Sequence, residues 1–112
     1  MNEYTKGQIY KYCEAVIMGN KPCACITLHV RDIEEGVKLV KSYKVNVFIE
    51  DHYQDWKILW IYIKSFMIEV IKKLPDKPNT AFDHWLLGKA FGYSDEAIEK
   101  YIKSMQNIEK DN

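Results

Sequence analysis

Apolar positions are densest in residues 56–74, WKILWIYIKSFMIEVIKKL, where residues 58–63 form the longest unbroken apolar run of the chain. If the whole segment were one helix, Ile61 and Ile68 would fall outside its apolar stripe. If residues 58–63 form a strand, their β-branched and aromatic side chains suit a buried position in a sheet. The pattern favours the strand, and the single helix remains the alternative.

The segment after this strand is predicted to form a short helix over residues 66–74. Ser65 stands at a capping position, and Pro75 ends the helix because the residue before a proline avoids helical angles. A membrane span needs about 20 apolar residues. This run is shorter and is bordered by charged residues, namely Lys57, Lys64 and Glu69. We therefore expect no membrane-spanning segment.

The first half of the chain alternates between helical and strand-like patterns. Thr5 and Gln8 have the spacing of a capping box. They precede a first helix with a helical apolar stripe: Ile9, Tyr12, Cys13 and Val16. Residues 23–30 alternate in the manner of a strand. Asp32 then begins a second helix, and residues 45–50 form a second strand.

A strand, a helix and a second strand in succession predict two parallel strands with a right-handed crossover. The polar loop of residues 50–55 is long enough for a hairpin into residues 58–63. We therefore predict an α+β domain with a small mixed three-stranded sheet in the order α-β-α-β-β-α. The first or the third strand lies at its centre.

Two further helices are predicted at the C-terminal end. The connector of residues 75–78, Pro-Asp-Lys-Pro, joins a body (residues 1–74) to a helical hairpin (residues 79–106). Thr80 with Asp83 begins one helix, and Ser94 caps the other. Residues 107–112 are expected to fray. The whole chain, residues 1–112, is predicted to be a single domain.

Gly88 falls in the middle of the first hairpin helix, where it lowers helix stability by about 1 kcal/mol. We expect a close contact with the second helix to compensate for it. The second helix has a predicted inner face with helical spacing: Ala97, Ile98, Tyr101, Ile102 and Met105.

The composition indicates a globular protein without net charge. Of 112 residues, 47% are hydrophobic and 29% are charged, and 16 basic groups balance 16 acidic ones. Arg31 is the only arginine, and arginine is the side chain that pairs bidentately with phosphate and guanine. We therefore expect no nucleic-acid partner.

Glycine-rich phosphate-binding loops are absent from the sequence. Residues 87–92, Leu-Gly-Lys-Ala-Phe-Gly, contain two glycines and a lysine, but they end a helix and do not follow a strand. The hairpin has the spacing of a helix-turn-helix, yet its second helix begins with Ser94, Asp95 and Glu96. Acidic residues there would face phosphates, which argues against DNA binding.

The three cysteines, Cys13, Cys23 and Cys25, do not form a disulfide framework, because their number is odd and two are separated by one residue. Together with the lack of a signal-peptide pattern, this predicts a cytoplasmic protein. Cys23, Cys25 and His29 share one face of a strand, and Cys13 could approach from the first helix, as zinc would require. The spacing matches no common zinc pattern, so we predict buried thiols, no metal and no cofactor.

Two Asp-His dipeptides, Asp51-His52 and Asp83-His84, could supply a general base. Sequence neighbours do not face each other on a helix, and no nucleophile motif accompanies the histidines. We expect His52 to be solvated and His84 to cap a helix or to pack beside Trp85. We predict no catalytic residue, and an enzyme that uses the histidines is the third functional hypothesis.

Aromatic residues are denser than a core of this size requires. A candidate binding surface comprises His52, Tyr53 and Trp56 before the third strand, and His84 and Trp85 in the helical hairpin. Tyrosine and tryptophan dominate binding energy at protein interfaces and also stack on bases. The structural alternative is that aromatic residues belong to the core and bridge the sheet to the hairpin. The residues that would do so are Trp60, Tyr62 and Trp85.

The hairpin loop Phe91-Gly92-Tyr93-Ser94, followed by Ala97, resembles the loop of a ubiquitin-associated helix pair, with Phe91 where methionine is usual. This resemblance implies a shared way of packing two helices and no function. Residues 83–102 and the lysine-rich composition resemble small uncharacterised proteins of low-GC Gram-positive bacteria and their phages and mobile elements. That resemblance implies no activity.

The leading functional hypothesis is a small cytoplasmic, non-enzymatic interaction or regulatory protein that binds another protein or itself. If a mobile element encodes it, it would modulate or inhibit a host protein. The alternative is a protein that binds a small molecule or nucleotide between stacked aromatic rings.

Overall fold

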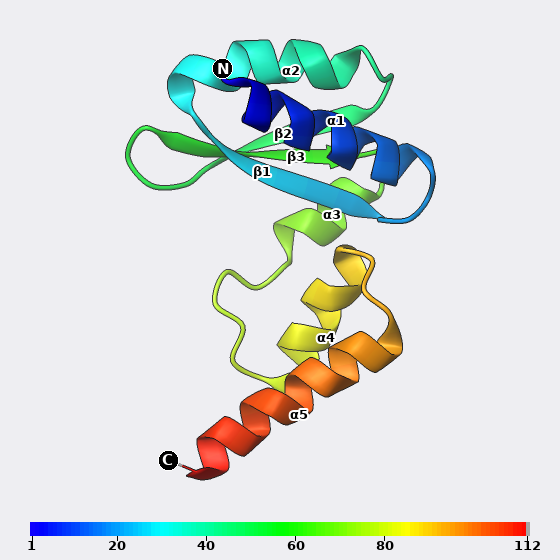
Figure 1. The fold of residues 1–112 in the computed structure, drawn as a ribbon, viewed down its shortest axis with the longest axis vertical. Coiled ribbons are helices and arrows are strands. Elements are labelled where there is room, and N and C mark those ends of the chain that lie inside the picture. Colours follow the sequence, from blue (N-terminus) through cyan, green and yellow to red (C-terminus); the bar gives the residue numbers. More distant parts are fainter. Residues whose placement is uncertain (112) are drawn as a thin grey trace.

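A computed structural model describes residues 1–111, with side chains described as far as Gln106. The elements follow in the order α1 (Glu3–Ile17), β1 (Cys23–His29), the short 3₁₀ helix η1 (Val30–Asp32), α2 (Ile33–Lys41), β2 (Asn46–Asp51), β3 (Trp56–Tyr62), α3 (Met67–Lys72), α4 (Ala81–Ala90) and α5 (Asp95–Asp111). The predicted α+β class and element order are confirmed (Figure 1). Among the described residues, no helix combines the length and apolar character that a membrane crossing needs.

Strand β3 lies at the centre of the sheet, whose order is β1-β3-β2. The register pairs Leu59 with Ile26 of β1 on one side and with Ile49 of β2 on the other. Both ladders are antiparallel, so β1 and β2 run parallel to each other as predicted but are not neighbours. The predicted mixed sheet is wrong in this detail, because the hairpin places β3 between the other two strands.

Residues 56–74 form a strand and then a helix, which rules out the single-helix alternative. The strand begins at Trp56, earlier than predicted, because the connection from β2 is shorter than the predicted loop. Phe66, and not Ser65, is the N-cap residue of α3, and no side chain caps this helix, so the predicted cap by Ser65 is wrong. The predicted cap of α1 is also wrong: the Asn2 carboxamide oxygen accepts a hydrogen bond from Thr5 N at 2.8 Å.

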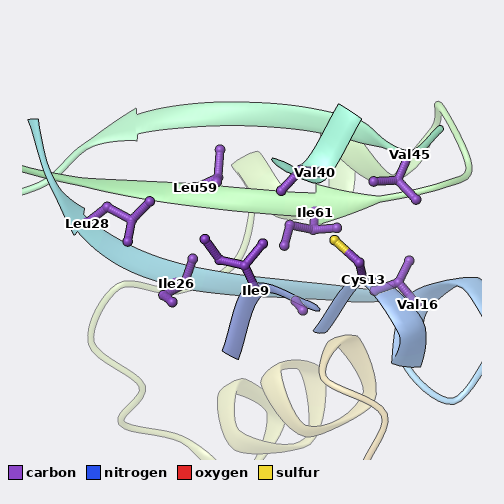
Figure 2. Packing of buried hydrophobic residues seen from close by; sticks show 10 residues of the cluster. Ile9, Cys13, Val16, Ile26, Leu28, Val40, Val45, Leu59 and Ile61 are labelled. Atoms are coloured by element: carbon purple, nitrogen blue, oxygen red, sulfur yellow. The ribbon is translucent and has the colours of Figure 1, made fainter. Parts of the chain in front are cut away.

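One face of the sheet is covered by α1 and α2 (Figure 1). Figure 2 shows how Ile9 and Cys13 of α1 and Val40 of α2 meet Leu59 and Ile61 of β3. These five side chains are fully buried. Burying a large aliphatic side chain stabilises the fold by about 1.5–3 kcal/mol. This cluster is therefore the main core of the protein.

The other face of the sheet is covered only at one end. Trp60 and Tyr62 of β3 and Cys23 of β1 pack there against α3 and against Ala90 at the end of α4. At the opposite end of this face, Thr27 and Trp56 are exposed. The second core is therefore smaller than the first.

The helical hairpin meets the body at the turn between α4 and α5. Lys21 Nζ donates a hydrogen bond to Phe91 O at 2.8 Å, and Cys23 Sγ donates one to Ala90 O at 3.3 Å. The Phe91 ring stacks on Trp60 with 5.9 Å between the ring centroids. Gly92 has a φ of +83°, and a side chain there would collide with the carbonyl oxygen of Asn20. These contacts fix the turn against the end of the sheet.

The contact predicted at Gly88 is confirmed. A Cβ atom at this position would lie 2.6 Å from Ile98 Cγ1, so only glycine lets α4 and α5 approach this closely. The predicted caps also form: Asp83 N donates to Thr80 Oγ1, and Ala97 N donates to Ser94 Oγ, both at 3.1 Å.

The predicted inner face of α5 is only partly correct. Ile98 is buried, whereas Ala97 and Tyr101 are exposed. The reason is that Ile98 packs directly on Gly88, whereas Ala97 and Tyr101 border a hollow that α4 and α5 leave between them. The predicted fraying of residues 107–112 falls outside the residues with described side chains and stays a prediction.

Candidate functional site

The first predicted group of binding residues lies at the β2–β3 turn. Trp56 N donates to Tyr53 O at 3.0 Å, and His52 N donates to Trp56 O at 3.3 Å, so the turn is tight. Tyr53, at the tip of the turn, is 66% exposed. Trp56 is 44% exposed and meets the edge of the His29 ring at 5.3 Å between centroids. The turn therefore presents two aromatic side chains, and its nearest aromatic neighbour comes from β1.

The second predicted group lies on α4, far from the first (Figure 1). The His84 ring meets the Tyr101 ring of α5 edge to face, with 5.3 Å between centroids. Trp85 is 44% exposed, and Lys89 Nζ lies 5.7 Å from its ring centroid. Successive residues on a helix point in directions about 100° apart. His84 therefore turns towards α5, and the predicted packing of His84 beside Trp85 is wrong.

The five predicted residues thus do not form one surface. A different hollow lies between α4 and α5, with a volume of about 460 Å³. Of the five predicted residues, His84 alone lines it. The other lining residues come from the connector, both helices and their turn: Pro78, Leu87, Gly88, Phe91, Tyr93, Ala97, Ile98 and Tyr101. We call this hollow the α4–α5 groove.

The α4–α5 groove exists because of the residues that the sequence places around Gly88. The missing side chain brings Ile98 against α4, and this contact forms the floor of the groove. Tyr93, at the turn, and Tyr101, one turn beyond Ile98, stand at its sides and are more than half exposed. The sequence pattern predicts helix packing for both Gly88 and Tyr101 and does not indicate the groove. Two aromatic residues beside a small-residue contact were the signal for a groove.

Neither Asp-His dipeptide forms a catalytic pair in the described contacts. Asp51 pairs with Lys57 at 3.0 Å, and Asp83 accepts a hydrogen bond from Asn79 N at 3.2 Å. Each carboxylate therefore has a partner other than the adjacent histidine. Nothing in this arrangement gives His52 or His84 a nucleophile to activate.

The cysteines are distributed over both faces of the sheet. Cys23 and Cys25 share one face of β1 as predicted, but Cys13 lies in the main core on the opposite face. Burial raises the pKa of all three thiols to about 11. Within the described residues, no three histidine, cysteine or acidic side chains gather as metal ligands would. The thiols act as small apolar side chains.

A second hollow, of about 440 Å³, lies where the end of α1 meets the β3–α3 connection. Its lining includes Ile17, Ile63 and Phe66, which are all exposed apolar side chains. No sequence pattern indicates this surface, because these residues are far apart in the sequence.

No protein-family model matches the sequence, and no curated protein matches it.

Proposed function

We propose that this chain is a small, non-enzymatic protein-binding module whose α4–α5 groove holds an apolar segment of a partner protein. The observation that supports this proposal most is the groove itself, which is floored by Ile98 and flanked by the exposed rings of Tyr93 and Tyr101. Buried aromatic anchors carry most of the binding energy at protein interfaces. A cytoplasmic location and a regulatory role, including modulation of a host protein if a mobile element encodes the chain, belong to the same proposal.

The chemistry of the lining favours an apolar segment over a nucleotide. Among the residues that the structure describes, none of those lining the groove is a lysine, arginine, aspartate or glutamate. A phosphate group requires cations or a cluster of backbone N–H groups. The polar side chains of the groove are those of His84, Tyr93 and Tyr101, which can orient a peptide by a few hydrogen bonds.

A small apolar molecule is the second candidate ligand. The groove volume of about 460 Å³ lies within the range of small-molecule sites, roughly 300–1,000 Å³. Such a ligand would contact the same residues, so the experiment must distinguish it from a peptide.

The test uses one blocking substitution and one matched control on the same helix. Ala97 is exposed and lines the groove, so Ala97→Lys places a charged chain in it without disturbing a buried residue. Gln106→Lys places the same side chain on another side of α5. A displayed random-peptide library is selected on the wild-type chain, and the affinities of selected peptides for all three proteins are measured by calorimetry.

We expect selected peptides with aromatic and aliphatic anchors, bound at least tenfold more weakly by Ala97→Lys and equally well by Gln106→Lys. A tenfold loss corresponds to about 1.4 kcal/mol. Peptides that bind all three proteins equally would contradict the proposal. Thermal stabilisation of the wild type by an apolar compound library, abolished by Ala97→Lys while no peptide is selected, would favour the second candidate instead.

A further inference from the structure

The second hollow, of about 440 Å³, has two walls that come from distant parts of the sequence. One wall is the end of α1 with the turn that follows it, and the other is the connection between β3 and α3. Both walls lie at the end of the sheet where β3 ends (Figure 1). The lining residues are Val16, Ile17, Gly19, Lys21 and Pro22 on the first wall, and Ile63, Lys64, Phe66 and Met67 on the second. We call this site the α1–α3 hollow. Each wall contributes apolar side chains and one lysine.

The apolar part of this lining is open to solvent. Ile17, Ile63 and Phe66 are 45%, 43% and 58% exposed. Val16 and Met67, which also line the hollow, are buried and belong to the main core and the second core. The volume lies within the range of small-molecule sites, roughly 300–1,000 Å³. The α1–α3 hollow can therefore hold the apolar part of a small ligand.

The end of the sheet around the hollow is positively charged, although the chain has no net charge. Three connections meet there, residues 18–22, 42–45 and 63–66, and each contains one lysine and no acidic residue. Among the ion pairs of the described residues, none involves Lys21 or Lys64. A cleft with apolar walls and charges of one sign concentrates the electric field within it. The hollow therefore attracts anions.

The polar side-chain groups of the hollow are hydrogen-bond donors. In the described lining, the side-chain nitrogen and oxygen atoms all belong to the two lysines. An ammonium group has three N–H donors and no acceptor. Lys21 Nζ donates one hydrogen bond to Phe91 O at 2.8 Å, so its other donors remain available. A ligand that binds here needs acceptors for these donors.

Backbone carbonyl groups beside the hollow already accept hydrogen bonds. Ile63 O accepts one from Asn46 Nδ2 at 2.8 Å, and Lys64 O accepts one from Met67 N at 2.9 Å. A peptide would bring one N–H donor for every residue except proline, and burying a donor without an acceptor is costly. The hollow therefore suits a peptide less well than a ligand whose polar atoms only accept hydrogen bonds.

We infer that the α1–α3 hollow binds a small anionic amphiphile, which is a molecule with an apolar body and one ionised head group such as a carboxylate. The apolar body covers Ile17, Ile63 and Phe66, and the head group pairs with the lysines of the two walls. The oxygen atoms of an ionised carboxylate are acceptors only, and charge-assisted hydrogen bonds to them are strong. This inference does not depend on the α4–α5 groove, which is a separate site.

The first test compares two probes with opposite head-group charge. Decanoate and decyltrimethylammonium are each titrated, below their micelle concentrations, into the isotope-labelled full chain. Amide NMR signals locate the binding: Gly19 and Lys64 report on the α1–α3 hollow, and Gly88 reports on the α4–α5 groove. We expect decanoate to shift the signals of Gly19 and Lys64 until they saturate, and the cationic probe to bind there roughly tenfold more weakly. Equal binding of both probes, or shifts confined to Gly88, would contradict the inference.

The apolar contact is tested with a shorter probe. Hexanoate has the same head group and covers less apolar surface, so we expect it to bind more weakly than decanoate. Equal affinities of the two carboxylates would show that the head group alone is bound, and the proposed role of the apolar walls would be wrong.

A charge reversal with a matched control tests the role of the lysines. Lys64 is exposed, so Lys64→Glu leaves both cores unchanged. Lys44→Glu makes the same change at the same end of the sheet, outside the lining of the hollow. We expect decanoate to bind roughly tenfold more weakly to Lys64→Glu and nearly as well to Lys44→Glu as to the wild type. Equal weakening in both variants would show that only the general field of this end attracts the anion, and direct pairing with Lys64 would be wrong.

Two further outcomes would assign the hollow to another occupant. If the chain sediments with phosphatidylglycerol vesicles but monomeric decanoate does not bind, this end of the sheet contacts a membrane surface and the inference is wrong. If peptides selected on the chain shift Gly19 and Lys64 while decanoate does not, the occupant is a partner protein. Peptides that shift Gly88 alone, with decanoate at Gly19 and Lys64, would support two separate sites.

Discussion

The α/β body and the helical hairpin bury their apolar side chains to very different extents. In the body, the central strand is covered on one face by two helices, and Leu59 and Ile61 are 0% exposed. In the hairpin, Ile98 is the buried one among the described side chains of α5, while Trp85 and Tyr101 remain exposed. The body therefore contains the main core of the protein. The hairpin supplies apolar surface that is available for binding.

The body and the hairpin contact each other only at a small part of the hairpin that the structure describes, namely its turn. The hairpin meets the body at its turn, through Lys21, Cys23 and the ring of Trp60. The groove lies between α4 and α5 themselves. A hairpin held by its turn can adjust the spacing of its helices without disturbing the sheet. This arrangement suits a binding surface on a stable support.

The largest expected effect comes from the centre of the body. Leu59→Ala removes a fully buried side chain from the middle strand and leaves a cavity, so we expect a loss of about 3–5 kcal/mol in the free energy of unfolding. Ile63→Ala, at an exposed position just after the same strand, should change it by less than about 1 kcal/mol. Urea denaturation followed by circular dichroism compares the two. Equal losses would contradict the assignment of the main core.

A smaller effect is expected at the helix contact of the hairpin. Gly88→Ala places a Cβ atom 2.6 Å from Ile98 Cγ1, so the Ile98 side chain must shift or the helices must separate, and overpacking of this kind destabilises by about 1–3 kcal/mol. Gly7→Ala is the matched control, because nothing lies within 4 Å of its added Cβ atom. This control should stabilise α1 by about 0.5–1 kcal/mol. Thermal unfolding measures both, and a stabilised Gly88→Ala would contradict the close contact.

The next effect is expected at the attachment of the hairpin. Lys21→Met removes the hydrogen bond to Phe91 O, which contributes about 1–3 kcal/mol when the donor is charged. We expect faster amide exchange in α4 and α5 and unchanged exchange in β3. Lys11→Met, at an exposed position of α1, is the control and should leave both regions unchanged. Equal acceleration in β3 and the hairpin would show that the two regions unfold together.

The smallest effect is expected from pH. Burial raises the pKa of Cys13, Cys23 and Cys25 from 9.0 to about 11, so folding favours the neutral thiols. Their contribution to stability is present below pH 9.0 and is lost as the pH rises through about 11. We expect Cys25→Ala to lose less stability than the wild type between these pH values, as measured by urea denaturation. Parallel pH profiles of the two proteins would contradict a partly buried thiol with a raised pKa at this position.

The sequence predicted the strands and helices of the body correctly, but it did not predict which strands are neighbours or which residue caps α1. The run at residues 58–63 identified the central strand, because six successive apolar residues with β-branched and aromatic members suit a strand with both faces covered. The neighbours of that strand depend on how a hairpin inserts between two parallel strands, and local pattern does not encode that choice. The cap of α1 was wrong for a related reason: Asn2 and Thr5 are both good caps, and only the path of the chain decides between them.

The candidate site was predicted less well. His84 and Trp85 are adjacent in the sequence, and their adjacency suggested a common surface, but helix geometry sends them in different directions. The α4–α5 groove depends on three segments that only the fold brings together: Pro78, the α4 residues around Gly88, and Tyr101. The sequence indicated a close helix contact at Gly88. It did not indicate that exposed rings would border that contact.

Native-state hydrogen exchange at increasing urea concentration tests the division between body and hairpin most directly. We expect the amides of Leu59 and Ile61 to exchange only by global unfolding, and those of α4 and α5 to exchange through a partial opening at a lower free energy. If the hairpin amides exchange with the same free energy and the same urea dependence as those of β3, the chain unfolds as one unit, and the distinction between a stable support and an adjustable binding hairpin is wrong.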